Sequence, residues 1–527
     1  MTPEPEDIPA PDPLLSPSAR KEGTFGQNAS LSVVAWSVST VAAFVCVPIT
    51  VRGLGAEAYG LMALVTALTG YIGLLDIGLG QALIRYLSYY RAIDEGRPML
   101  AIIRVALTWF TAAGVAAGVF FFVGAEWLAK DVLNVAADLL PDAVVVIRLS
   151  AANLVLALII SIGQALPMSF LRYDIAAGMD SVFTTAGWVG PAVVVMLGYG
   201  VVGVTSFYVA SNVVALLLYL YFGVRLMRTV RRDAGPEWRD IRRKVLSFAG
   251  LVAVNRVGTT VAKQTNRLVL GIVAGTAAAA YYQVPNLLTT KVSSLLTRIS
   301  QVLFPAGSAL IARGDTEGLR ALYFRSSRLI FWVNGCGAFA IAVYAAPLLK
   351  YWVSPEYADR GATAMVVFTA TAALSATSLP VGFLSWSAAK AGVNLVFSLA
   401  TSAISLAAIY PLASRFGVTG AAMAGLLGAL VAPFFIHYVD RRMLHVSSWS
   451  VFRHCHLPTL AGAGVAALLS SVVLVRFAES LLSTVLLLAV TGLLALLLSA
   501  LFGAVKREEL RDLQKVARSM RDRILRR

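Results

Sequence analysis

Residues 480–503 read SLLSTVLLLAVTGLLALLLSALFG, a run that contains no charged side chain. A helix of about 20 apolar residues spans the roughly 30 Å hydrocarbon core of a bilayer and satisfies its own backbone hydrogen bonds there. The whole chain resembles this run, because 58% of its 527 residues are hydrophobic and only 14% are charged. About a quarter of the residues of a soluble protein are charged. The composition therefore predicts a membrane protein and excludes a large extracellular or cytosolic catalytic domain.

Apolar runs of this length recur along the chain, and we count about 14 of them. The fold class that they predict is an all-α polytopic membrane protein with about 14 transmembrane helices. The predicted spans are approximately 30–51, 58–82, 99–124, 142–165, 176–198, 202–226, 246–274, 277–303, 325–349, 362–386, 391–413, 417–438, 457–475 and 480–503.

The positive charges indicate how these spans are oriented. Of the 44 Lys and Arg residues, 32 fall on one face of the predicted membrane domain, 6 on the other and 6 within spans. Cytoplasmic loops are the ones enriched in Lys and Arg, so both termini are predicted to be cytoplasmic. The same asymmetry explains most of the net charge of +16 without a nucleic-acid partner.

An internal repeat relates spans 1–6 to spans 7–12. Its matched segments are 55–59 (GAEAY) with 275–281 (GTAAAAY), 166–171 (LPMSFL) with 379–384 (LPVGFL), and 199–204 (YGVVGV) with 416–421 (FGVTGA). Because six is an even number, the two halves share one orientation, as in transporters that rock about a central cavity. We predict two pseudo-repeated six-helix bundles around such a cavity, plus two extra C-terminal helices.

This repeat divides the chain into six parts. The predicted parts are a disordered cytoplasmic tail (1–29), an N-terminal six-helix bundle (30–228), a basic cytoplasmic linker (229–245), a C-terminal six-helix bundle (246–440), two additional transmembrane helices (441–503) and a basic amphipathic cytoplasmic tail (504–527).

Five cations lie inside the seventh and eighth predicted spans. Their spacings of four and seven residues put Arg256, Lys263 and Arg267 on one helix face, and Lys291 and Arg298 on one face of the next helix. An ionisable residue in hydrocarbon costs at least about 2.5–3.5 kcal/mol, so it marks a wet interior by default. Since neither helix supplies a facing carboxylate, we predict a cationic cavity that binds an anion. Alternatively, Arg256 and Arg298 reach the inner interface and Arg267 the outer one.

Other polar residues complete the predicted site. Gln264 and Asn266 flank the cationic face and are included among the substrate-binding residues. Asp76 and Asp180 each have either an ion-pair or coupling role or an interfacial one, and for Asp180 we favour an interfacial position at a helix end. No nucleotide-binding loop and no nucleophile with its base occur, and the His454-Cys455-His456 triplet lacks a second ligand pair. We therefore predict a non-enzyme without a metal or other cofactor.

Two groups of motifs resemble a known family. The runs 58–64 (AYGLMAL) and 74–80 (LLDIGLG) with Arg85, and 264–268 (QTNRL) through Gly271 followed by Tyr281 and 304–305 (FP), are similar to Wzx-type polysaccharide flippases. These belong to the multidrug/oligosaccharidyl-lipid/polysaccharide exporter superfamily. The resemblance covers about residues 28–440. Many members carry an aspartate where this chain has Asn266, so a role that needs that carboxylate does not transfer.

The resemblance implies that the protein flips an undecaprenyl-pyrophosphate-linked oligosaccharide across the bacterial cytoplasmic membrane. Polysaccharide polymerase and export machinery are then the expected protein partners, with membrane lipids around the chain. The alternative is a cation-coupled exporter of drugs or metabolites on the same fold, which should need carboxylates at mid-depth. A membrane-embedded polymerase or ligase is a weaker alternative, because the loops on the outer side are short.

Overall fold

The structure is a computed structural model that describes residues 22–76, 79–92, 96–228, 260–261, 264–301, 303–388, 390–506 and 509. Within these residues every regular element is helical. The first half contains α1 (Glu22–Ile72), α2 (Leu79–Ala92), α3 (Gly96–Val123), α4 (Ala125–Trp127), α5 (Leu140–Ser169), α6 (Tyr173–Met196) and α7 (Val201–Met227).

The second half begins with a helical segment at 264–274. It continues with α9 (Thr276–Ser300), α10 (Leu303–Ala312), α11 (Thr316–Val343), α12 (Ala345–Trp352), α13 (Pro355–Thr377), α14 (Leu379–Ser387), α15 (Ala391–Ala429) and α16 (Ala432–Val439), and then α17 (Ser448–Val451), α18 (Leu457–Leu469) and α19 (Leu481–Leu501). Short turns of 3₁₀-helix (Gly73–Asp76, Val475–Phe477) and π-helix (Leu128–Val132, Asp440–Leu444, Phe452–His456, Ser470–Leu474) connect these helices.

Ten helical ranges in the described part are long and apolar enough to cross a membrane. The chain is thus an all-α, multi-pass membrane protein, which confirms the predicted fold class. The number fourteen stays a prediction. Two of the ten ranges contain a sharp bend, so each can hold two spans. The predicted span in α9 is too polar to be among the ten, and much of the predicted span 246–274 lies outside the described residues.

The two sharp bends occur at glycines with positive φ. Gly55 has φ 80° and ψ 167° within α1, and Gly417 has φ 55° within α15, a region that side chains with a Cβ rarely adopt. Gly275, which the predicted repeat matches to Gly55, has nearly the same angles, φ 89° and ψ 169°. The matched segments thus share a backbone turn, and each turn leads into a helix.

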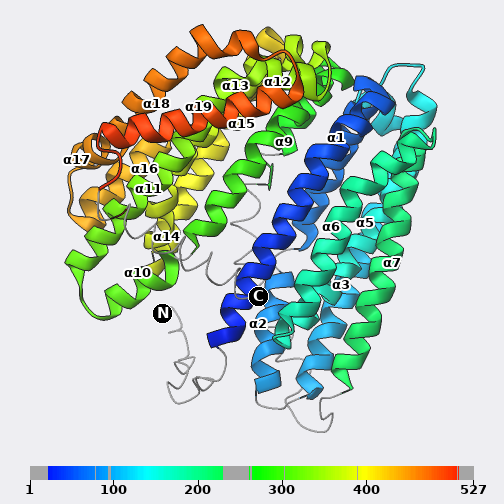
Figure 1. Cartoon of the computed structure of the whole chain (residues 1–527). Coiled ribbons are helices and arrows are strands. Elements are labelled where there is room, and N and C mark those ends of the chain that lie inside the picture. The colour runs from blue at the N-terminus through cyan, green and yellow to red at the C-terminus, as the bar shows by residue number, and fades with distance from the viewer. Residues whose placement is uncertain are drawn as a thin grey trace.

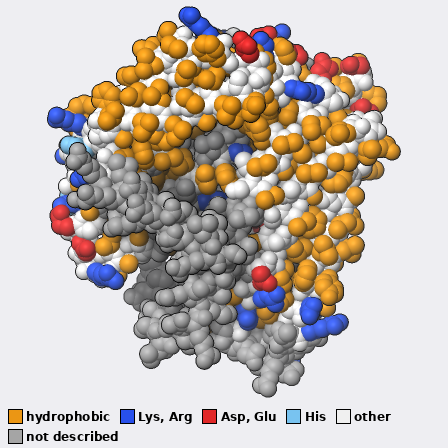
Figure 2. Space-filling model, viewed as in Figure 1, with side chains coloured by type: hydrophobic (Ala, Val, Ile, Leu, Met, Phe, Trp, Pro, Cys, Tyr) orange, Lys and Arg blue, Asp and Glu red, His pale blue; other side chains and the backbone are white. Residues whose placement is uncertain are grey.

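The helices form two groups with a hollow between them. α1 to α7 lie on one side, α9 to α19 lie on the other, and α1 packs against α9 where the groups meet (Figure 1). The first group packs around α5, which contacts α2, α3 and α7, and the second around α13, which contacts α9, α11, α12 and α15. In the space-filling view, Lys and Arg side chains are visible inside the hollow (Figure 2). The fold therefore exposes cations to an interior space.

The two C-terminal helices cover the outer face of the second half. α18 and α19 pack against each other and against α11 (Figure 1). Trp332 of α11 donates from Nε1 to the Oγ of Ser499 at 2.8 Å, and small residues at this junction, including Ala463 and Ala495, are fully buried. Small side chains allow membrane helices to approach closely, which fixes this pair to the second half.

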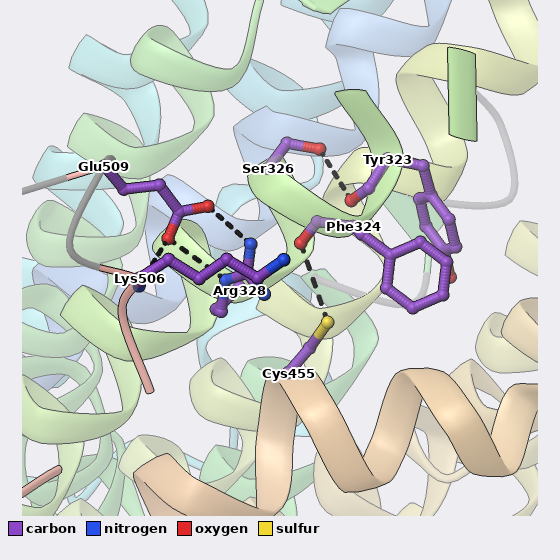
Figure 3. A network of polar contacts seen from close by, with 7 residues as sticks. All are labelled: Tyr323, Phe324, Ser326, Arg328, Cys455, Lys506 and Glu509. Atoms are coloured by element: carbon purple, nitrogen blue, oxygen red, sulfur yellow. Dashed lines mark hydrogen bonds and ion pairs between the residues drawn. The ribbon is translucent and has the colours of Figure 1, made fainter. Parts of the chain in front are cut away.

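A buried ion pair holds the start of the C-terminal tail against α11. Arg328 and Glu509 are 2.5 Å apart between Nη2 and Oε1, and their side chains are only 8% and 7% exposed. Glu509 also accepts a hydrogen bond from the backbone N–H of Lys506 at 2.9 Å (Figure 3). The described start of the tail predicted at 504–527 is therefore docked on the second half.

Replacing Glu509 by Gln should lower the stability of the protein by about 3–5 kcal/mol, because Arg328 would keep a buried charge without its partner. The measurement is the midpoint of thermal unfolding in detergent. The control is Asp174→Asn, which breaks an ion pair to Arg172 in which both side chains are more than half exposed, and which should change the midpoint little. Equal midpoints for the two variants would contradict the structural role of the buried pair.

Candidate functional site

One end of the hollow is closed by contacts between the two halves. Arg52, just before the bend of α1, donates from Nε to the carbonyl of Val353 at 2.6 Å. Its Nη2 donates to the carbonyls of Tyr351 and Trp352, each at 3.2 Å. The last carbonyls of a helix lack partners within the helix and carry partial negative charge. Arg52 therefore stabilises the end of α12 and joins it to α1.

Aromatic packing adds to this closure. Trp352 donates from its indole N–H to the carbonyl of Phe44 at 2.7 Å, and the two rings stack with centroids 5.1 Å apart. Val47 and Val51 of α1 are buried in the same cluster with Tyr281 at the start of α9. We call this set of contacts the closed end of the hollow.

A cavity of about 480 Å³ lies near the opposite end of α9. Lys291 and Arg298, both predicted site residues, line it together with Ser294, which lies between them on the same helix face. α1 contributes Trp36 and Ser39, and Trp36 donates from Nε1 to the Oγ of Ser294 at 3.2 Å. The two cations therefore share one cavity, formed between the first and the second half, which we call the cationic cavity.

Trp188 of α6 connects this cavity to a second one. The Nζ of Lys291 lies 5.1 Å from the centroid of the Trp188 ring, within the distance of a cation–π interaction. Trp188 also lines a neighbouring cavity of about 160 Å³ together with Tyr59 and Arg267. Arg267 is 7% exposed, and its Nη1 is 3.5 Å from the carbonyl of Ala63. Of the predicted site cations, the structure thus places Lys291 and Arg298 at one cavity and Arg267 at the neighbouring one.

Asp180 lines the cationic cavity from α6. The sequence left two roles open for it, a partner of a cavity cation and an interfacial residue, and both stay predictions. α6 packs against α1, and the cavity brings the first turns of α6 near the last turns of α9. Among the described residues no ion pair within 4 Å joins Asp180 to Lys291 or Arg298.

The remaining predicted residues have separate surroundings. Gln264 packs against the backbone of Gly70 in α1, and Asn266 is buried on the side of the second half, where it donates to the Oγ of Ser405 at 3.0 Å. Arg256 and Lys263 lie outside the described residues.

Asp76 has a local structural contact. Its Oδ1 accepts a hydrogen bond from the backbone N–H of Gly80 at 3.0 Å, in the first turn of α2. A carboxylate at this position caps the start of a helix and interacts favourably with its dipole. The ion-pair or coupling role of Asp76 stays a prediction.

Of the residues that α6 supplies to the site, sequence reasoning considered Asp180 and missed Thr184 and Trp188. Asp180, Thr184 and Trp188 are spaced by four residues and so share one helix face. Asp180 and Thr184 line the cationic cavity with Lys291, and Trp188 contacts the Lys291 ammonium. This stripe is a signal that periodicity could have detected. Trp36, by contrast, gives a weak signal, because its neighbours on the same face of α1, which include Ser39 and Thr40, are small and uncharged.

The architecture is that of known membrane transporters. An inward-closed structure of the lipid II flippase MurJ superposes with a TM-score of 0.68 at 10% identity, over 89% of this chain and 98% of that one. An inward-facing multidrug resistance MATE family transporter of the MOP superfamily has a TM-score of 0.66 at 15% identity, over 81% and 99%. At such low identities these likenesses concern the fold alone, and they define its class.

The chain belongs to the polysaccharide biosynthesis protein family, whose model matches residues 49–361. It is 18% identical to the "Putative O-antigen transporter" of Shigella flexneri over 80% of this chain and 98% of that protein. It is 22% identical to the "Uncharacterized membrane protein EpsK" of Bacillus subtilis (strain 168), over 80% and 85%. The resemblance to Wzx-type flippases that the sequence motifs indicated is thereby confirmed.

Arg52→Gln should weaken the closed end, because a guanidinium that donates to three carbonyls is lost. A hydrogen bond to a charged group contributes about 1.5–3 kcal/mol, so we expect local opening to become roughly tenfold more frequent. The measurement is hydrogen–deuterium exchange of residues 44–52 and 345–353. Arg415→Gln, at an exposed arginine, is the control. Exchange that matches the wild type would show that Arg52 does not hold this end.

Proposed function

We propose that the protein flips an undecaprenyl-pyrophosphate-linked oligosaccharide from the cytoplasmic to the outer leaflet of the bacterial cytoplasmic membrane, for polysaccharide biosynthesis. The observation that carries this proposal is the pair of cations, Lys291 and Arg298, in a cavity between the two halves. The name of the Shigella flexneri relative, an O-antigen transporter, and the family description agree with it.

The chemistry of such a substrate fits the cationic cavity. A pyrophosphate bears at least two negative charges and cannot enter hydrocarbon without compensation. Ammonium and guanidinium groups form strong, charge-assisted hydrogen bonds with phosphate oxygens. Lys291 and Arg298 would pair with the pyrophosphate, with Arg256, Lys263 and Arg267 as further cations of the same path, while the polyprenyl chain stays in lipid. Transport of this kind needs no covalent chemistry from the protein.

The two halves would supply the movement. We assign 30–228 and 246–440 as the bundles that rock against each other, with 441–503 attached to the second one. The termini and the linker 229–245 would lie in the cytoplasm, as the positive charges indicate. In this orientation the cationic cavity lies on the cytoplasmic side of the closed end, and the closed end with Arg52 faces outward. The structure then corresponds to the state that receives substrate.

The exporter alternative is less well supported. A cationic drug or a coupling cation needs carboxylates in the membrane interior. The cationic cavity has two cations, Lys291 and Arg298, and a single carboxylate, Asp180. Its charge therefore favours an anionic ligand.

Lys291→Gln should reduce flipping of the lipid-linked oligosaccharide in proteoliposomes by about 10- to 100-fold, because a charged hydrogen bond of about 1.5–3 kcal/mol to the pyrophosphate is lost. The matched control is Arg148→Gln. Arg148 is also a cation over an aromatic ring, 5.4 Å from the centroid of Phe122, but it lines a largely apolar cavity between α3 and α5, away from the hollow.

Protein abundance in the membrane should stay normal for both variants, which separates transport from folding. Wild-type flipping by Lys291→Gln, or an equal loss in both variants, would contradict the role of the cationic cavity.

A further inference from the structure

A third cavity, of about 620 Å³, lies within the second half and has a different chemistry. Its described lining comes from Asn266, α9, α13, α14, α15 and the start of α16, and none of these described residues is ionisable. Its walls carry hydroxyl, amide and aromatic side chains. Among them are Thr371, Ser375, Asn394, Ser402, Phe383 and Trp386. Its volume falls within the roughly 300–1,000 Å³ of small-molecule binding sites. We call it the neutral cavity.

The polar lining of this cavity follows helix periodicity. On α15, Asn394, Ser398 and Ser402 succeed one another every four residues, so they form one stripe along the helix. On α13, Thr371 and Ser375 are also four residues apart. Both stripes of hydroxyl and amide groups line the same cavity, whereas a tightly packed helix interface would carry small residues in contact. This arrangement indicates a ligand with many hydrogen-bonding groups.

Hydrogen bonds within the cavity wall indicate which groups such a ligand should carry. Thr371 donates to the carbonyl of Val367 at 2.8 Å, and Thr401 donates to the carbonyl of Phe397 at 2.9 Å. Each hydroxyl oxygen thereby keeps its lone pairs as acceptors. A ligand rich in hydroxyl donors and free of charge matches this lining.

The aromatic residues suit the same ligand. Trp386 packs edge-to-face against Phe383, with ring centroids 5.4 Å apart, and is 45% exposed. An aromatic ring offers a rigid apolar surface, and the C–H faces of sugar rings are apolar while their hydroxyl groups point outward around the ring. Hydroxyl acceptors next to an accessible indole ring therefore provide complementary surfaces for neutral sugars. An acyl chain would offer no donors to the free lone pairs of these hydroxyl groups.

The neutral and the cationic cavities meet at α9. Thr297 lines the neutral cavity and Arg298, the next residue, lines the cationic one. Successive residues point about 100° apart around a helix and are 1.5 Å apart along its axis. Both belong to the last turn of α9, so the two cavities flank the same end of this helix. Asn266 and Arg267 show the same division, with Asn266 on the neutral cavity and Arg267 on the cavity beside Trp188.

We propose that the neutral cavity binds the uncharged sugars of the lipid-linked oligosaccharide while Lys291 and Arg298 hold its pyrophosphate. This inference rests on the proposed function, because it takes from it a ligand in which charge and sugars are covalently adjacent. The cavity then acts as a specificity site: it selects for the glycan, whereas the cationic cavity selects for the charge.

The test compares two probes bound to the purified full-length protein in nanodiscs. One is undecaprenyl pyrophosphate, and the other is the same lipid bearing a neutral tetrasaccharide. The wild type should prefer the glycosylated probe. Trp386→Leu and Ser375→Leu, at two exposed cavity positions, should reduce that preference on the order of tenfold and leave the Kd of the bare lipid unchanged.

Matched controls separate the cavity from general effects of the substitutions. Trp449→Leu and Ser414→Leu change exposed residues that do not line the neutral cavity and should keep the wild-type preference. Lys291→Gln should weaken binding of both probes. A preference that survives in Trp386→Leu and Ser375→Leu, or a wild type without any preference, overturns the sugar site and leaves the proposed function standing. A wild type that binds neither probe overturns the proposed function and, with it, this inference.

Discussion

The cost of placing a charge in hydrocarbon is the constraint on which this structure depends. Lys291 and Arg298 belong to α9, the helix of the second half that contacts the first half. Neither charge is stable within the membrane unless water, an aromatic face or a counter-charge compensates it. The cavity with Asp180 and the ring of Trp188 supply such compensation. A hollow between the halves is therefore a requirement of this sequence, since tight packing of α6 against α9 at this level would bury the cations without solvent.

The same physics explains why the fold was largely predictable. A span must be about as long as the bilayer is thick, so each apolar run in the sequence predicts a helix, and α3, α5, α6, α7 and α19 begin and end within a few residues of the predicted spans. The bends within α1 and α15 were harder to predict. Hydropathy contains no information on φ, and only the presence of glycine at 55 and 417 hinted at the turns that break α1 and α15. The separate helix α2 was missed because only its first residues fall within the predicted second span, while the rest, with Arg85 and Arg91, is too polar to be counted as a span.

The site was predictable only for residues that lie close together in the sequence, on one helix. The stripe Lys291, Ser294 and Arg298 follows from spacing along one helix, and the structure brings all three to one cavity. Trp36 and Asp180 belong to the same cavity but come from helices more than 100 residues earlier in the chain. Their proximity depends on how α1, α6 and α9 pack, which no single segment encodes. The sequence left the role of Asp180 open for this reason, because position along a span does not specify which neighbour a side chain faces.

The two ends of the hollow differ in a way that suggests how ligand binding could be linked to movement. The closed end is held by hydrogen bonds from Arg52 to carbonyls and by the stacking of Phe44 on Trp352, contacts that water can replace at modest cost. At the other end, closure would expel water from around Lys291, Arg298 and Asp180, which together carry one uncompensated positive charge. An anion removes that penalty, since it supplies the missing charge within the cavity. A ligand can shift the equilibrium between two conformations only by its difference in affinity for them. An anion held by both cations would have such a difference, because it would bind more tightly when the end with Lys291 and Arg298 closes around it.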